Sequence, residues 1–337
     1  MRLDVKGYHH AYPVHIGKGM ISNLGAVLDT SIPTAIITDD GVPPSYIETV
    51  SKQLKVKTTV CVRAGEGSKS FDTYQDVLLK LQKAGLDRSD RLIAVGGGMV
   101  SDLGGFAAAT YKRGIAFIIL PTTLLSMVDA SIGGKVAINT SYAKNSVGAF
   151  HTPQSVIIDP STLKTLPERH FSNGMAEVIK TALIGDRALF EHLKTNPSKP
   201  DQEHIIQASL NVKAKIVEED PLDKGKRGLL NYGHTIGHAI ERESGYQLLH
   251  GECVAMGMQI MARGRKFETD LLEVLTRYNL KRETDLDSEV LMKRIREDKK
   301  VMGDHIDIAD VTEVGNGFIE RIKINDFFDR IKGGTPL

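Results

Sequence analysis

The chain has 337 residues, of which 25% are charged and 41% are hydrophobic, as in ordinary globular proteins. This length exceeds what one small core needs and favours two domains. The 43 Lys and Arg residues nearly balance the 42 Asp and Glu residues, so no net positive charge is available to hold nucleic acid or a membrane surface. An anionic small molecule would have to be bound by locally placed cations.

The two cysteines, Cys61 and Cys253, lie far apart in the sequence and do not indicate a disulfide scaffold. The first ten residues contain no apolar signal core. No stretch approaches the roughly 18 uncharged apolar residues of a membrane span. These features predict a cytoplasmic protein with neither a nucleic acid nor a membrane as partner.

The first half of the chain alternates short apolar runs with helical stretches. Buried strands are expected at 34–41, 91–95, 116–120 and 155–158, and a helix is expected at 101–110. Strands that alternate with helices indicate a parallel sheet covered on both faces.

The strand signal fades from about Ser161. Helices are predicted at 175–184, 201–219, 234–243, 253–266 and 288–300. The expected fold class is therefore an α/β domain over residues 1–160, followed by an all-α domain over residues 161–337.

Three glycines, Gly96–Gly98, follow the second predicted strand directly. They would let a ligand approach the backbone, and the N-terminus of the next helix would offer free N–H groups to an anion. A tight turn capped by Ser101 or Asp102 is the simpler alternative. Three consecutive glycines exceed what a cap requires, so we favour a cofactor site. A second Gly-rich turn at 64–69 would, taken alone, be typical of a solvated loop.

Two histidines, His234 and His238, are one helical turn apart. This spacing suits two metal ligands, or one ligand and one acid–base group. An isolated pair is more often two partly exposed histidines, but the adjacent Gly233 and Gly237 indicate a close backbone approach.

Two further positions carry residue types that can bind metals, His250 and Glu177. His250 opens another helical stretch and by itself could be a cap, a core residue or a ligand. Glu177 and Lys180 stand at i, i+3, a spacing that is commonest in surface ion pairs. Together, Glu177, His234 and His250 offer one oxygen and two imidazole ligands, the set found in open catalytic zinc sites.

Several cations could complete a pocket for a substrate with more than one negative charge. Each would singly be typical of a solvated surface. They are Arg113, Lys135, Lys144, Lys180, Lys213, Arg227 and the pair Lys299–Lys300.

An ordered set of motifs between about Ala64 and Met258 resembles the 3-dehydroquinate synthase family. The motifs are Gly96-Gly-Gly-x-x-x-Asp102, Phe106–Gly114, Pro121–Leu125, Asp129–Ala137, Ala176–Lys180, Asn231–Glu241 and His250-Gly-Glu252. The resemblance implies a Rossmann-like nucleotide-binding domain, a helical metal-binding domain and a homodimer.

The cofactors implied by the resemblance are NAD and either Zn2+ or Co2+. The metal ligands would be Glu177, His234 and His250. The NAD site would be formed by Asp39, Gly65, Glu66, Lys69, Gly97, Gly98, Met99, Val100, Ser101, Asp102, Thr122, Thr123, Lys135, Lys144, Thr162, Leu163, Lys164 and Thr165.

The implied substrate is 3-deoxy-D-arabino-heptulosonate 7-phosphate, which the family converts to 3-dehydroquinate and phosphate. The steps are a transient oxidation by NAD, phosphate elimination, reduction, ring opening and an aldol closure. The resemblance assigns the phosphate to Lys135, Asn145 and Lys300, with Arg113 supplied by a neighbouring subunit. It assigns the carboxylate to Lys213 and Arg227, the hydroxyls to Asp129, Lys180 and Asn231, and proton transfer to His238.

Three other functions share parts of this pattern. Another sugar-phosphate cyclase, such as a 2-deoxy-scyllo-inosose synthase, is disfavoured by the segment Gly133-Gly134-Lys135. A metal-dependent polyol dehydrogenase would not need so many cations. A non-catalytic NAD-binding module would not need metal ligands of mixed type.

Overall fold

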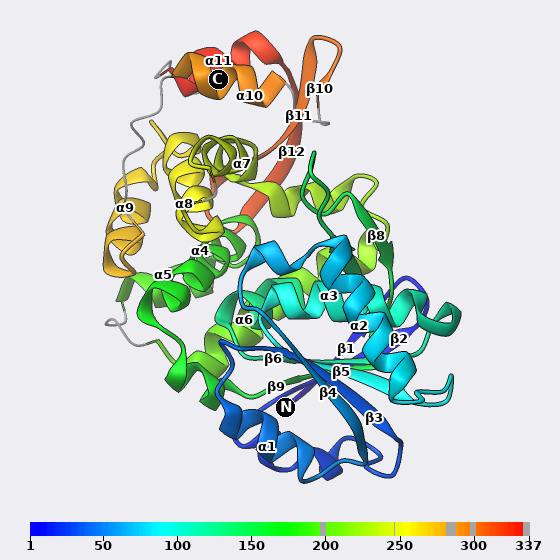
Figure 1. Ribbon diagram of the computed structural model, residues 1–337. Helices are drawn as coiled ribbons and strands as arrows, with labels where there is room; N and C mark the ends of the chain where they lie inside the picture. The colour runs from blue at the N-terminus through cyan, green and yellow to red at the C-terminus, as the bar shows by residue number, and fades with distance from the viewer. Residues whose placement is uncertain (196–199, 246, 281–287, 297–300, 333–337) are drawn as a thin grey trace. The chain divides into compact units, whose positions relative to one another are not determined.

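The computed structural model describes residues 1–195, 200–245, 247–280, 288–296 and 301–332 (Figure 1). The chain divides into two compact units, Met1–Pro167 and Glu168–Leu337. The domain boundary expected near residue 160 lies a few residues before this division, at the start of the short 3-10 helix η6 (Pro160–Thr165).

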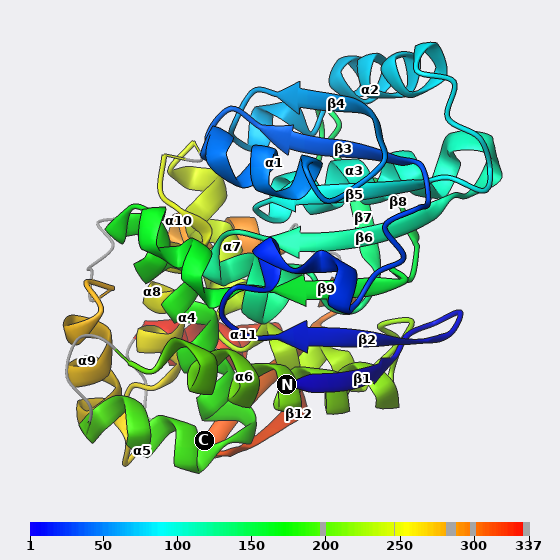
Figure 2. The ribbon, with the colours of Figure 1, turned by 90° about the horizontal axis from the view of Figure 1, so that it is seen from below.

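The first unit is built on a seven-stranded sheet with the order β1-β2-β9-β6-β5-β3-β4, which can be followed strand by strand in Figure 2. Only β1 and β2 pair antiparallel, and every other pair is parallel. The strands are β1 (Arg2–Lys6), β2 (Ala11–Ile16), β3 (Thr34–Asp39), β4 (Val56–Val62), β5 (Arg91–Gly96), β6 (Ala116–Pro121) and β9 (Ser155–Ile158). The four strands predicted from apolar runs are therefore confirmed as neighbours in one largely parallel sheet.

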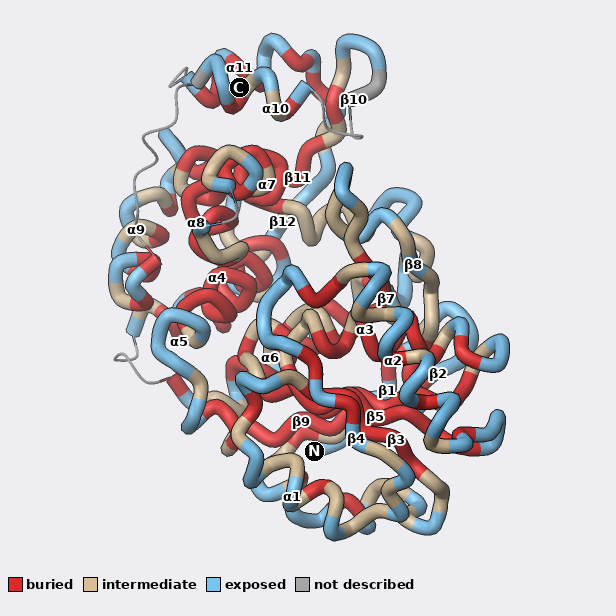
Figure 3. The backbone as a smooth tube through the Cα atoms, in the orientation of Figure 1, coloured by how far each residue is buried: buried red, intermediate tan, exposed pale blue. Residues whose placement is uncertain are grey.

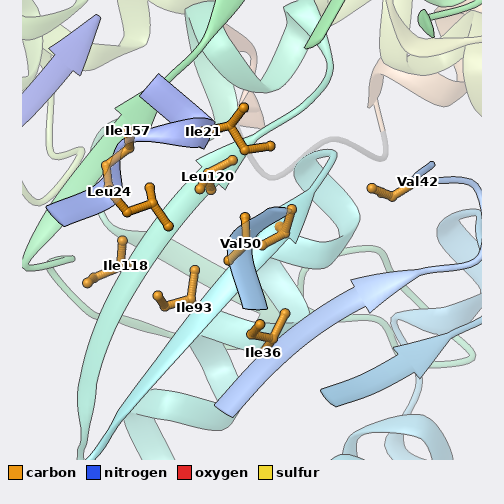
Figure 4. Packing of buried hydrophobic residues seen from close by; sticks show 10 residues of the cluster. Ile21, Leu24, Ile36, Val42, Val50, Ile93, Ile118, Leu120 and Ile157 are labelled. Carbon is orange, nitrogen blue, oxygen red and sulfur yellow. The ribbon is translucent and has the colours of Figure 1, made fainter. Parts of the chain in front are cut away.

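Alternate side chains of these strands are buried on opposite faces of the sheet. Ile36, Ile93 and Ile118 pack in a cluster with Val50 of α1 (Pro44–Ser51) and the 3-10 turns that follow β2 (Figure 4). On the other face, Ile37, Ala94 and Phe117 lie next to Gly104 of α3 (Gly98–Thr110). Because both faces are covered, the central strands β3, β5, β6 and β9 are buried at nearly every position.

The chain reverses direction across the sheet between β3 and β5. The connection from β3 through α1 leads outward to β4, whereas the connection from β5 through α3 leads the other way, to β6. The carboxyl ends of β3 and β5, Asp39 and Gly96, therefore flank a topological switch point. Ligands of open α/β sheets bind in the crevice at such a point.

The remaining elements of this unit lie outside the sheet. α2 (Phe71–Lys83) packs on β4 and α3, and the hairpin β7 (Lys135–Ile138) and β8 (Val147–Phe150) packs on α3. Short helical turns occupy Met20–Ser22, Leu24–Ala26, Glu66–Ser68, Tyr111–Arg113 and Ser126–Ala130.

The second unit is mainly helical, as predicted. Its helices are α4 (Glu168–Gly185), α5 (Arg187–Thr195), α6 (Gln202–Glu219), η7 (Lys226–Asn231), α7 (His234–Glu243), α8 (His250–Met261), α9 (Glu268–Arg277), α10 (Ser288–Arg296) and α11 (Ile324–Ile331). Figure 3 shows α4 and α8 as the most deeply buried of them. None of the helices in the described ranges is long and apolar enough to cross a bilayer.

The expectation that this unit contains helices alone needs a correction. A three-stranded antiparallel sheet is formed by β10 (Val301–Met302), β11 (His305–Glu313) and β12 (Asn316–Lys323). β11 and β12 form a hairpin whose turn contains Gly315 at φ 85°, a left-handed conformation that suits glycine. The sheet gains its stability from cross-strand pairing, which the helical periodicity of the preceding segments does not reveal.

α7 and α8 cross in direct backbone contact. A Cβ atom at Gly257 of α8 would lie only 2.0 Å from the carbonyl oxygen of Gly233, just before α7. A Cβ at Gly237 would lie 3.0 Å from the carbonyl oxygen of Cys253. The close approach predicted from Gly233 and Gly237 is thus confirmed, and it holds the two helices that begin at His234 and His250 together.

This crossing predicts that Gly257→Ala destabilises the second unit. The added methyl group would force α7 and α8 apart, at a cost of about 1–3 kcal/mol or more in the free energy of unfolding. Urea unfolding measures the loss. Gly25→Ala is the control, because its Cβ would lie 3.8 Å from the nearest atom, Thr30 Cγ2. Equal stability of the two variants would contradict the prediction.

Candidate metal centre and cofactor site

Three side chains of the second unit converge from three helices. Glu177 lies in the middle of α4, and His234 and His250 are the first residues of α7 and α8. Glu177 Oε1 lies 3.5 Å from Nε2 of His234 and 3.4 Å from Nε2 of His250. Ligands bound about 2.0–2.1 Å from a tetrahedral zinc ion lie roughly 3.3–3.5 Å apart. The structure thus brings the three predicted ligands together at the spacing of a coordination shell.

The chemistry of the donor atoms also fits a divalent cation. Glu177 Oε1 is buried and has no hydrogen-bond partner within the described part of the chain, an arrangement that costs free energy unless a further group binds there. The carbonyl oxygen of Tyr232 lies 3.2 Å from His234 Nδ1. A carbonyl only accepts, so the proton is on Nδ1 and the lone pair of Nε2 faces Glu177.

The charges around this group favour cation binding as well. Burial alone would raise the pKa of Glu177, but Lys180, His234 and His250 lower it well below its ordinary value. Burial lowers the pKa of His234 well below its ordinary value. Glu177 is therefore an anion and His234 a neutral imidazole, the protonation states in which both groups bind metals.

Glu241 also contacts this cluster, although its residue type and spacing did not mark it in the sequence. Its Oε2 lies 3.5 Å from His250 Nδ1. Burial alone would lower the pKa of His250, but the carboxylates of Glu177 and Glu241 raise it to about 10, so a metal ion bound at Nε2 would displace the proton there. A carboxylate on the far nitrogen is the usual partner of a metal-binding histidine. The sequence signal that could have identified Glu241 is its position at the end of the motif Asn231–Glu241, three residues after His238.

The N-terminus of α8 is fastened to α4, and this places His250. Gly251 N donates to Asn173 Oδ1 at 2.6 Å, and a Cβ at Gly251 would lie 2.1 Å from the carbonyl oxygen of Asn173. Glu252 accepts from Leu249 N at 2.9 Å and forms a bidentate ion pair with Arg169 at 2.8 and 2.9 Å. The second and third residues of the motif His250-Gly-Glu252 are therefore explained by packing and by an N-terminal cap.

The other predicted residues of this unit are placed as follows. Lys180 is buried and contacts Glu177 Oε2. The ring of His238 lies 5.3 Å from that of His234 and 5.8 Å from that of His250, centroid to centroid. Lys213 on α6 and Arg227 on η7 are buried, and Asn231 ends η7. Lys300 lies outside the described residues.

The glycine run at the switch point of the first unit forms an open helix N-terminus. Gly97 is the N-cap of α3 and provides no side-chain cap, so the first N–H groups of the helix remain available to an anion. Cβ atoms at Gly97 and Gly98 would lie 3.2 Å from Thr123 Cγ2 and Ala130 Cβ. This bare backbone suits the pyrophosphate of a dinucleotide.

A buried ammonium group lies beside the same helix. Lys69 Nζ lies 2.6 Å from Asp102 Oδ2 and 3.4 Å from Glu66 Oε1, and it also donates to Asn145 Oδ1. Burial raises the pKa of Asp102 to about 6, although Lys69 opposes the shift. The structure thus joins three residues predicted for NAD with one, Asn145, predicted for the substrate phosphate.

The remaining residues predicted for the first unit lie at the carboxyl edge of the sheet or in nearby turns. Asp39 ends β3 and accepts from Gly41 N at 2.8 Å, and burial raises its pKa. Thr122 N donates to the Gly96 carbonyl at 2.9 Å, and Thr123 Oγ1 accepts from Ser126 N at 3.2 Å. Their predicted companions are Asp129 in the turn after β6, Lys135 at the start of β7, Lys144 before β8, and Thr162, Leu163, Lys164 and Thr165 in η6.

Arg113 lies in a strained turn. It has φ 66°, and Lys112 before it has φ 50°. Left-handed conformations are uncommon for such residues. Arg113 makes no hydrogen bond or ion pair with the described residues of its own chain, so its predicted role across a subunit boundary stays a prediction.

Two family models match consecutive parts of the chain. Residues 59–173 match the model described as "3-dehydroquinate synthase N-terminal", and residues 174–301 match "3-dehydroquinate synthase C-terminal". The chain is 46% identical over 275 residues to 3-dehydroquinate synthase of Acidithiobacillus ferrooxidans, covering 78% of this chain and 75% of the relative. It is 41% identical over 358 residues to that of Enterococcus faecalis, covering 99% of this chain and all of the relative.

Solved structures with the same fold include two sugar cyclases. A 2-deoxy-scyllo-inosose synthase complexed with carbaglucose-6-phosphate, NAD+ and Co2+ has a TM-score of 0.88 and 24% identity, covering 99% of this chain and 100% of that one. A 2-epi-5-epi-valiolone synthase from Streptomyces hygroscopicus with NAD+ and Zn2+ has a TM-score of 0.86 and 24% identity, covering 95% of this chain and 94% of that one. At this identity they establish the fold alone.

The contact between Glu241 and His250 predicts that Glu241→Gln weakens metal binding. The amide keeps an oxygen beside His250 Nδ1 but loses the charge, and such changes commonly cost about 10–100-fold in affinity. Competition with a chromogenic chelator measures the dissociation constant for Zn2+.

Two variants frame this measurement. His250→Ala removes one of three ligands and should lose the metal altogether. Glu219→Gln, which alters an exposed carboxylate paired with Lys226, should leave the affinity unchanged. Equal affinities of Glu241→Gln and Glu219→Gln would show that Glu241 has no part in the centre.

Proposed function

This chain belongs to the 3-dehydroquinate synthase family, and from that premise we propose that it converts 3-deoxy-D-arabino-heptulosonate 7-phosphate to 3-dehydroquinate and phosphate. The observation that carries the proposal is the cluster of Glu177, His234 and His250, in which a buried carboxylate oxygen makes no hydrogen bond with the described residues. It occurs in a chain that matches a 3-dehydroquinate synthase over that relative's whole length.

The cofactors are NAD and a divalent cation, Zn2+ or Co2+. The cation is held by Glu177, His234 and His250, and NAD by the open N-terminus of α3 and the turn around Lys69. When bound, NAD accepts and returns a hydride, and the cation polarises the hydroxyl and carbonyl oxygens of the substrate.

Side chains of the metal centre supply charge and proton transfer. Lys180 keeps Glu177 ionised, because an ammonium group in contact with a buried carboxylate stabilises its charged form. We assign proton transfer to His238, whose ring lies beside those of His234 and His250. A positioned imidazole of this kind contributes about 10²–10⁴-fold to the rate.

The anionic ends of the substrate are assigned to separate sets of cations. Lys213 and Arg227 bind the carboxylate, since a buried guanidinium group matches a carboxylate with two parallel hydrogen bonds. The phosphate is assigned to Lys135, Asn145 and Lys300, with Arg113 supplied by a second subunit. Asp129, Lys180 and Asn231 bind the hydroxyl groups.

We also propose that the protein is a cytoplasmic homodimer, as the family resemblance implies. Sedimentation equilibrium measures the mass of the assembly directly.

The proposed reaction predicts that NAD is needed only in catalytic amounts. The hydride returns to the substrate, so the overall change is redox-neutral. Inorganic phosphate should be released over many turnovers without a matching rise in NADH absorbance. Glucose 6-phosphate and sedoheptulose 7-phosphate serve as comparison substrates. One NADH per product with no phosphate released would replace this proposal with a polyol dehydrogenase.

The carboxylate assignment predicts a large loss in Arg227→Lys. Lysine keeps the charge but lacks the planar fork, so kcat/KM for the heptulosonate should fall by about 10–100-fold, corresponding to one or two hydrogen bonds to a charged group. Steady-state kinetics measure the fall. Arg187→Lys is the control, because Arg187 is exposed and pairs only loosely with Glu313. An unchanged kcat/KM in Arg227→Lys would remove Arg227 from the site.

A further inference from the structure

Asn139 ties together two parts of the first unit that have separate predicted ligands. One is the turn at 65–69, assigned to NAD, which we call the cofactor turn. The other is the loop at 140–146, which carries Lys144 and Asn145 and which we call the phosphate loop. Asn139 stands between them, directly after β7.

Three hydrogen bonds of Asn139 connect the two segments. Its backbone N donates to the carbonyl oxygen of Lys69 at 2.7 Å, and its side-chain Nδ2 donates to Glu66 Oε1 at 2.8 Å. Its side-chain Oδ1 accepts from the backbone N of Asn145 at 2.8 Å. One amide side chain therefore holds the cofactor turn with its donor and the phosphate loop with its acceptor.

A second connection runs in parallel with the first. Lys69 Nζ donates to Asn145 Oδ1 and is paired with Asp102. Asn145 has φ 53°, a left-handed conformation that is uncommon outside glycine but that asparagine tolerates. Both its backbone N–H and its side-chain oxygen are thus held by groups that belong to, or are fastened to, the cofactor turn.

From these contacts we propose that Asn139 is a positioning residue that couples the two ligands, so that NAD and the phosphate of the substrate strengthen each other's binding. The inference rests on the proposed function, which assigns NAD to the cofactor turn and phosphate to the phosphate loop. NAD fixes Glu66 and Lys69, these fix Asn139, and Asn139 holds Asn145 in its binding conformation.

The coupling is reciprocal, because it is a free energy shared by the two binding equilibria. Couplings of this kind change an affinity by about 5–150-fold. A ligand that holds only the cofactor turn should therefore tighten the binding of a ligand that contacts the phosphate loop, and the reverse change should have the same size.

The experiment measures the dissociation constant for NAD with and without a saturating, non-reactive phosphonate analogue of the heptulosonate. In the metal-loaded wild-type enzyme the analogue should tighten NAD binding about fivefold or more. In Asn139→Ala that ratio should fall severalfold toward one. Ser146→Ala is the matched control, because it removes contacts of the Ser146 hydroxyl within its own loop, to Thr140 Oγ1 at 3.1 Å and to the Ala143 carbonyl at 3.3 Å. It should keep the wild-type ratio.

Asn139→Asp separates the two halves of the link without changing shape. The carboxylate still accepts from Asn145 N but faces Glu66 with a like charge, so the coupling should also fall. If circular dichroism shows that the Asn139→Ala variant is unfolded, this isosteric variant takes its place in the experiment.

Hydrogen exchange tests the same link in the unmodified enzyme. NAD alone should slow exchange of the backbone amides in residues 139–146. Unchanged exchange there, or the wild-type coupling ratio in Asn139→Ala or Asn139→Asp, overturns the inference while the proposed function stands. A wild-type enzyme that binds neither NAD nor the analogue overturns the proposed function itself.

Discussion

The second unit is organised around the buried carboxylate of Glu177. An ionised group in the interior costs several kcal/mol unless it is paired and hydrogen-bonded. Lys180, one turn away on α4, offsets this cost by pairing with Glu177 Oε2. His234 of α7 and His250 of α8 lie next to Glu177 Oε1. The three helices must therefore meet at one point, and the contact between Gly233 and Gly257 lets them do so.

The first unit is arranged to bind anions, whereas the second is arranged to bind a cation. Where the second unit gathers a carboxylate and imidazoles that suit a cation, the first gathers N–H groups and ammonium groups that suit anions. Gly97 leaves the N-terminus of α3 without a side-chain cap, and this terminus lies at the switch point of the sheet between β3 and β5, where open α/β sheets bind ligands. Lys69 remains charged there although it is buried, because Asp102 and Glu66 raise its pKa.

The fold alone does not decide which ring the enzyme closes. The two solved synthases of the same fold are named for different products. Under the proposed function, specificity comes from side chains such as Arg227 and Asn145, which stand on η7 and on the loop before β8. Their positions are fixed by neighbours, Asp220 for the backbone of Arg227 and Asn139 for that of Asn145.

Local sequence determined the elements that carry the site and the chemical identity of its groups. Apolar runs marked β3, β5, β6 and β9, helical periodicity marked α4, α6 and α7, and ligand type marked Glu177, His234 and His250. Only the tertiary structure decided which side chains meet. The strands β11 and β12 depend on cross-strand pairs. Glu241 contacts His250, nine positions later in the chain, and Asn139 contacts Asn145 and the distant Glu66. Such contacts leave no periodic trace in the sequence, because they are set by how separate elements pack.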